Sequence, residues 1–184
     1  MAARTLLASV AIVGVLSAIV WRLFSYDPTE FHGAAPMRDT GMFTFYRYHA
    51  TIGEIPLATS GTYALRFSGM PATRMVLQLY VMGGSDANRK LFESLTTEIT
   101  AEIVDSRGKV ICAASGTLFG TDASKRWMLM SSANEAAYWH ESCRSVSFES
   151  RTDYTLRVGL RNVDPRSPGV ILRAMLQGGG IELS

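Results

Sequence analysis

A strict alternation of apolar and polar residues limits the possible folds of this chain more than any other pattern in it. In residues 154–162, the aromatic and aliphatic side chains of Tyr154, Leu156, Val158 and Leu160 occupy every second position. Successive side chains of a β-strand point to opposite faces, so this spacing is typical of a strand with one buried face. An amphipathic helix would place its apolar residues three and four positions apart. Residues 154–162 therefore predict a half-buried β-strand.

The alternation recurs along the chain and predicts about nine strands in all. The eight further segments are residues 43–49, 61–69, 75–81, 97–103, 109–118, 126–130, 145–149 and 169–177. Residues 105–108 read Asp-Ser-Arg-Gly, a tight turn that joins two of these strands into a hairpin. Two short helices are also expected. One covers residues 86–95, and the other follows Ser132, where Glu135 completes a capping box.

Many short strands separated by turns indicate a mainly β domain. Residues 42–184 are long enough to bury a core of their own. We expect a two-sheet antiparallel β-sandwich of jelly-roll or immunoglobulin-like type. The pattern does not determine the strand order.

An uncharged apolar run, residues 5–21, precedes this domain. As a helix it would be about 25 Å long, near the lower limit of a membrane span. Arg22 can extend toward the lipid headgroups, and Trp21 and Tyr26 lie where interfacial aromatic residues are expected. We expect residues 1–24 to form a transmembrane anchor and residues 25–41 to form a linker.

Two other interpretations of the run remain open. A cleaved signal peptide needs small residues just after the apolar core, whereas residues 21–24 read Trp-Arg-Leu-Phe. A buried helix of a globular domain should be amphipathic, and this run is apolar on all faces. The positive charges on the two flanks nearly balance, and we expect the large domain to lie outside the cytoplasm. Gly14 and Ala18 form a small-residue pair that permits close helix packing in the bilayer.

The chain has two cysteines, Cys112 and Cys143. An even number in an exported domain predicts one disulfide, whereas two buried thiols are the alternative for a cytosolic domain. Cys112 lies an even number of positions from the inward residues of its predicted strand, so its side chain should also point inward. Cys143 shares the alternation of the outward Ser145 and Ser147, so a disulfide requires an irregular backbone over residues 140–144.

Motifs for catalysis, phosphate binding and metal binding are lacking from the sequence, and we expect no cofactor and no metal. His140 beside Glu141 is the one candidate for a hydrolase-type centre, and a capping or solvated histidine is the alternative. Four carboxylates lie in predicted loops or near the C-terminus without ligand-like spacing and are interpreted as solvated turn residues: Asp122, Asp153, Asp164 and Glu182.

Two sets of residues are candidates for ligand binding. Trp127, Tyr138 and Trp139 could stack on sugar rings, or they could close the sandwich core. Four outward arginines could form an anion-binding patch if their strands are neighbours: Arg66, Arg157, Arg161 and Arg173. The alternative is cross-strand pairing of these arginines with Glu98, Glu102 and Glu149.

A formal net charge of +2 gives no indication of a nucleic-acid partner. We expect a single-pass membrane protein whose sandwich lies outside the cytoplasm, in a periplasm, on the cell exterior or in an organelle lumen. Its expected role is binding or assembly with a protein partner, as an accessory subunit of a membrane or envelope complex. A carbohydrate-recognition module that uses the aromatic residues and a hydrolase centred on His140 and Glu141 are the alternatives.

Overall fold

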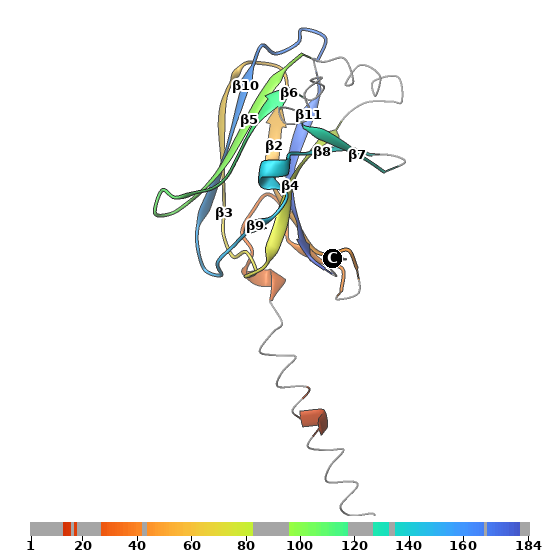
Figure 1. Cartoon of the computed structure of the whole chain (residues 1–184), viewed down its shortest axis with the longest axis vertical. Helices are drawn as coiled ribbons and strands as arrows, with labels where there is room; N and C mark the ends of the chain where they lie inside the picture. Colours follow the sequence, from red (N-terminus) through yellow and green to blue (C-terminus); the bar gives the residue numbers. More distant parts are fainter. Residues whose placement is uncertain are drawn as a thin grey trace, which may run out of the picture.

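The chain forms a mainly β structure of two antiparallel sheets, as the alternation predicts (Figure 1). The structure, a computed structural model, describes residues 13–15, 17, 27–41, 44–82, 96–117, 127–132, 135–167 and 169–180. Every strand pairing within these residues is antiparallel.

The larger sheet has the strand order β1-β2-β11-β4-β8-β7, and β9 pairs with the end of β4. Its strands are β1 (Arg38–Asp39), β2 (Tyr46–Pro56), β4 (Arg74–Met82), β7 (Met128–Ser132), β8 (Glu135–Trp139), β9 (Val146–Ser147) and β11 (Ile171–Gly179). The smaller sheet has the order β3-β10-β5-β6. Its strands are β3 (Gly61–Phe67), β5 (Glu98–Asp105), β6 (Val110–Thr117) and β10 (Tyr154–Arg161). Two short 3-10 helices, η1 (Pro28–Glu30) and η3 (Glu141–Cys143), complete the described elements.

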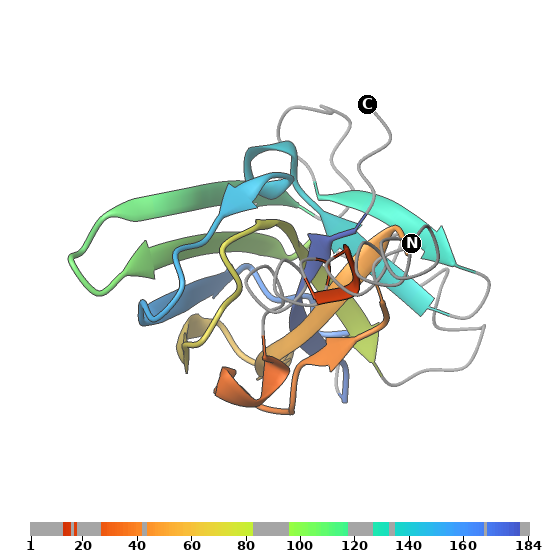
Figure 2. The same ribbon diagram turned by 90° about the horizontal axis from the view of Figure 1, so that it is seen from below.

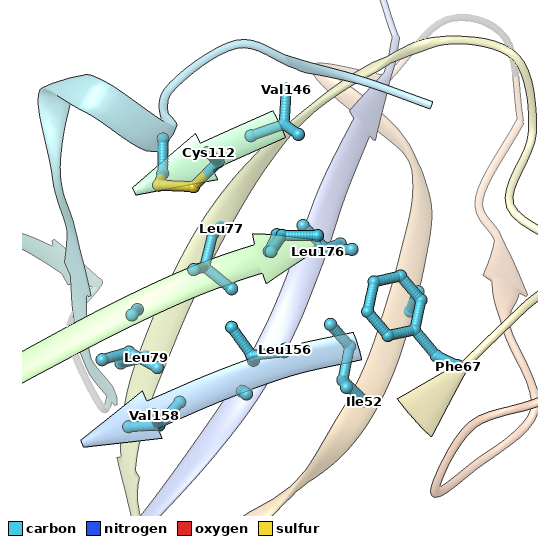
Figure 3. Close-up of a cluster of buried hydrophobic side chains, with 14 of the residues drawn as sticks. Ile52, Phe67, Leu77, Leu79, Cys112, Val146, Leu156, Val158 and Leu176 are labelled. Carbon is cyan, nitrogen blue, oxygen red and sulfur yellow. A yellow bond between two sulfur atoms is a disulfide. The ribbon is translucent and has the colours of Figure 1, made fainter. Parts of the chain in front are cut away.

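The core lies between the facing sheets. Leu156 and Val158 of β10 point toward Leu77 and Leu79 of β4, and all four side chains are fully buried (Figure 3). Burying a side chain of this size contributes roughly 1.5–3 kcal/mol. The inward faces predicted for residues 61–69, 97–103 and 154–162 are thereby confirmed.

The predicted hairpin at residues 105–108 is confirmed and is stabilised by one carboxylate. The Asp105 side chain is buried and accepts hydrogen bonds from the backbone N–H groups of Arg107 and Lys109, both at 2.9 Å. Gly108 adopts a φ of +83°, which only glycine tolerates without strain. The hairpin extends from one side of the molecule in both views (green, Figures 1 and 2).

The predicted helix after Ser132 is wrong. Residues Glu135–Trp139 form β8, which lies between β4 and β7 and is hydrogen-bonded to both. Because β8 is paired on both sides, its backbone groups form hydrogen bonds with two neighbouring strands. This pairing stabilises a strand more than the capping box would stabilise a helix. The other predicted helix, residues 86–95, lies outside the described residues.

The second half of β2 was also not predicted, because its alternation is interrupted. The register between β2 and β11 shifts at Ala174 and Met175, so Gly53 pairs with Ala174 while Thr51 pairs with Met175. Both Ile52 and Gly53 are consequently buried in succession. A β-bulge of this kind removes the period-2 signal from the sequence.

Part of the predicted linker is integrated into the folded domain. Phe31 and Met37 are buried in the core cluster, His32 bridges to Ser68, and β1 pairs with β2 at the edge of the larger sheet (orange, Figure 2). Residues 27–41 therefore supply core side chains and an edge strand to the folded domain, instead of forming only a spacer.

The predicted anchor, residues 1–24, lies outside the described residues except for 13–15 and 17, which are helical. Gly14 is among these helical residues and Ala18 is not described. Within the residues that the structure describes, no helix combines the length and the apolar composition needed to cross a membrane.

Candidate ligand-binding groove

The larger sheet carries a groove on the face that points away from the core. We call it the sheet groove, and its floor consists of three cross-strand rows of side chains. The rows are Arg38–His49–Gln177, Thr51–Met175–Gln78 and Arg173–Tyr80–Ala137. Ala35, Pro36, Tyr46 and Met82 complete the lining, and the volume is about 650 Å³. Small-molecule sites in proteins typically measure roughly 300–1,000 Å³.

The floor of the sheet groove contains two glutamines that are shielded from water. Gln78 is only 1 % exposed and Gln177 only 6 % exposed, although both lie on the face opposite the apolar core. Polar side chains on the outer face of a sheet are usually solvated, so the burial of both glutamines is unusual for this face. The side-chain amide of Gln177 donates a hydrogen bond to the Tyr80 hydroxyl at 2.9 Å. This bond joins neighbouring strands β11 and β4 and holds both side chains in place.

The imidazole of His49 lies beside these groups in a defined protonation state. Its Nε2 atom is 3.1 Å from the carbonyl oxygen of Tyr46. A carbonyl oxygen only accepts, so Nε2 carries the proton and Nδ1 is left as an acceptor. Burial lowers the pKa of His49, the hydrogen bond to the Tyr46 carbonyl partly opposes this, and the positive charge of Arg38 lowers the pKa further. His49 is therefore mainly neutral at pH 7, and because its Nε2–H is bonded to Tyr46, it offers Nδ1 to a ligand as an acceptor.

The charges that line the sheet groove are all positive. Its described lining contains Arg38 and Arg173 and no carboxylate. Arg173 is paired with Glu54 just outside the groove, at 2.7 Å between Nη2 and Oε1. Arg38 is exposed and forms no ion pair with any residue in the described part of the chain. One end of the groove therefore carries a guanidinium group that no carboxylate of the described residues neutralises.

The aromatic residues predicted to bind sugars do not form an exposed platform. Trp127 is fully buried, and its indole N–H donates to the carbonyl oxygen of Ile99 at 3.2 Å. Tyr138 is 1 % exposed and belongs to the same core. Trp139 is half-buried, and the guanidinium carbon of Arg144 lies 5.3 Å from its ring centroid. Trp127 and Tyr138 thus fit the alternative interpretation, in which they close the sandwich core.

The predicted arginine patch is divided between the two sheets. Arg66, Arg157 and Arg161 belong to the smaller sheet, whereas Arg173 belongs to the larger one. Arg157 pairs across the strands with Glu102, at 3.3 Å between Nη1 and Oε2. Because the sheets face each other through the core, their outer surfaces point apart and the four arginines cannot act as one site.

The predicted disulfide joins Cys112 to Cys143, with a Cα–Cα distance of 5.4 Å (Figure 3). Both residues are buried. The 3-10 helix η3 interrupts the alternation just before β9, so that Cys143 points inward while Ser145 and Ser147 remain exposed. The irregular backbone required over residues 140–144 is confirmed.

His140 serves as the N-cap of η3. Its Nδ1 atom accepts a hydrogen bond from the backbone N–H of Ser142 at 3.2 Å. The ring is buried and lies edge-on to Trp127 with 5.6 Å between centroids, and its Nε2 has no hydrogen-bond partner among the described residues. Burial lowers the pKa of His140. Glu141 is exposed and pairs with Arg144, so His140 and Glu141 do not share a hydrogen bond that would orient a catalytic base.

The predicted turn carboxylates have separate positions. Asp164 is buried, and the guanidinium of Arg166, whose Nη2 donates to its Oδ2 at 2.6 Å, holds the pKa of that carboxyl well below its usual range. Asp164 therefore organises its turn from a buried position. Asp153 is exposed, and Asp122 and Glu182 lie outside the described residues. Among the residues with described positions, no group of three or more His, Cys, Asp or Glu side chains could hold a metal ion.

Comparison with known proteins does not assign this chain to a family. No protein-family model matches it, and no curated protein matches its sequence significantly. Sequence reasoning missed the sheet groove, although the alternation in residues 75–81 already places Gln78 and Tyr80 on an outward face. Their neighbours across the sheet depend on the strand order.

Proposed function

We propose that this protein is a membrane-anchored, extracytoplasmic β-sandwich that binds a ligand in the sheet groove. The observation that carries the proposal is the set of buried polar side chains on the outer face of the larger sheet. Gln78, Gln177 and the neutral His49 offer preorganised donors and acceptors in a concave site of about 650 Å³. Convergent polar groups in a concave site are what small-ligand recognition requires.

The proposed location rests on two features. The Cys112–Cys143 disulfide is of the kind that forms in oxidising compartments. The apolar run at residues 5–21 precedes the domain and is near the minimum length of a membrane-spanning helix. Together they favour a sandwich that is tethered to a membrane and exposed to an extracytoplasmic space.

Within this proposal the role is recognition, and the bound ligand is part of a membrane or envelope assembly. A hydrolase gains no support from Cys143, because its sulfur is bonded to Cys112, nor from His140, which caps η3. The accessory-subunit role proposed from the sequence is compatible with the sheet groove, since a partner can present its ligand group there.

The location is tested on the full chain expressed in cells. We expect the protein to resist alkaline carbonate extraction from membranes, and we expect a protease added on the extracytoplasmic side of the membrane to digest the sandwich. We also expect both cysteines to label with a thiol reagent only after reduction of the denatured protein. Recovery of the intact chain as a soluble cytosolic protein with two free thiols contradicts the proposed location.

The binding role is tested by a thermal-unfolding screen of the full chain in detergent against sugars, organic anions and peptides. Compounds that raise the unfolding temperature are then tested on Arg38→Gln, which changes an exposed residue of the groove lining. Arg66→Gln is the matched control, because Arg66 is an exposed arginine of the other sheet. Groove binding predicts that Arg38→Gln weakens the effect and Arg66→Gln does not. Compounds that affect both variants as strongly as the native chain contradict it.

A further inference from the structure

We infer that the ligand of the sheet groove is a saccharide that carries a carboxylate, such as a uronic-acid or sialic-acid unit. The inference rests on the proposed function, whose groove it uses. The floor carries groups that suit sugar hydroxyls, one end carries the Arg38 guanidinium without a described carboxylate partner, and most strands of the floor are paired on both sides.

The floor presents groups that suit sugar hydroxyls. Three planar polar groups lie in the floor, those of Gln78, Gln177 and the neutral His49. The amides can donate and accept hydrogen bonds in fixed directions, and the imidazole can accept one at Nδ1. A sugar hydroxyl both donates and accepts, so it matches such mixed groups better than a purely anionic or purely apolar ligand does. The rings of Tyr46 and Tyr80 also line the groove, and an aromatic face offers apolar contact to the C–H face of a sugar ring.

The charge at one end indicates a carboxylate on that saccharide. Arg38 begins the row Arg38–His49–Gln177 and has no carboxylate partner within the described chain. The described lining as a whole contains no Asp or Glu. A guanidinium group offers paired donors that match the two oxygens of a carboxylate. Neighbouring strands lie about 4.8 Å apart, so this row spans about 10 Å, which accommodates a disaccharide with its carboxylate at Arg38.

The strand arrangement argues against an extended peptide. Most of the floor is formed by β2, β11 and β4, and each of these strands is paired on both sides. A peptide that adds to a sheet needs a free strand edge, where its backbone can form hydrogen bonds. Among the described strands, the floor reaches an edge only at the two residues of β1, Arg38–Asp39, so a peptide would have to bind the rest of the groove through side chains.

The test uses the full chain in detergent micelles and isothermal titration calorimetry. The probes are disaccharides of galacturonate and glucuronate, a sialyl-lactose, and the carboxyl-reduced form of each. A blocked tri-glutamate peptide is the competing anion. We expect at least one acidic sugar to bind about tenfold more tightly than its reduced form, as expected for one charge-assisted contact. Arg38→Gln should remove the preference for the acidic sugar over its reduced form, and Arg66→Gln should preserve that preference.

Three results overturn the inference: none of the acidic sugars binds, an acidic sugar and its reduced form bind equally, or the peptide binds more tightly than every sugar. The proposed function has a separate criterion. It survives these results if any other compound from the thermal screen loses its effect in Arg38→Gln but not in Arg66→Gln. Because Arg38 is exposed, its replacement should leave the unfolding temperature of the unliganded chain unchanged, and that measurement confirms that the variant is folded.

Discussion

Reduction of the Cys112–Cys143 disulfide should lower the stability of the domain by several kcal/mol. The bond connects Cys112 of β6, in the smaller sheet, to Cys143 of η3, which lies between β8 and β9 of the larger sheet. It therefore holds one edge of the smaller sheet to a connection of the larger sheet. The residues that it joins are 31 positions apart in the sequence.

The expected magnitude follows from the entropy of closing this loop in the unfolded chain. For a loop of this length, the chain-entropy relation gives about 12 cal/mol/K, or about 3.7 kcal/mol at 25 °C. Breaking the bond releases that entropy to the unfolded state and leaves the native contacts in place. For a chain of this size, each kcal/mol corresponds to roughly 2–4 °C in Tm, so the reduced protein should unfold about 7–15 °C lower.

The assay is urea unfolding of the full chain in detergent, with and without reductant, followed by tryptophan fluorescence. Trp127 is fully buried, so its emission should report loss of the core. The double variant Cys112→Ala/Cys143→Ala is the control, because its unfolding should not respond to reductant. A loss below about 1 kcal/mol on reduction would refute the loop-entropy reasoning.

Three further predictions concern the core and its surroundings. Trp127→Phe removes the indole hydrogen bond to the Ile99 carbonyl oxygen and shrinks a fully buried side chain, which should cost about 1–3 kcal/mol in urea unfolding; an unchanged midpoint contradicts this. Gly178→Ala forces a methyl group against the Arg74 carbonyl oxygen and should cost about 1–3 kcal/mol, and an unchanged Tm contradicts it. The pKa of His140 is lowered on folding, so the unfolded state binds the proton more readily and stability falls as pH drops below about 6.5. His140→Asn keeps a capping side chain and should lose less stability than the native chain between pH 7.5 and pH 5.5; an equal loss contradicts this.

Strand positions could be predicted because they depend on local alternation. Residues 154–162 and 61–69 correspond closely to β10 and β3, and the turn at residues 105–108 was recognised from its Asp and Gly alone. In each case one face of a strand or one turn conformation is encoded by residues that are adjacent in the chain. The prediction was wrong after Ser132, where pairing of β8 with two other strands outweighs the local capping pattern.

The amino-acid sequence by itself determined that the chain is mainly β and that its two cysteines are compatible with one disulfide. Only the tertiary structure decided that η3 turns Cys143 inward, that the four arginines divide between two sheets, and that Arg38, His49 and Gln177 share one row. The physical reason is that alternation specifies which face of a strand is buried but not which strands become neighbours. A binding site on a sheet is made of cross-strand neighbours, and these are set by hydrogen bonding between segments far apart in the chain.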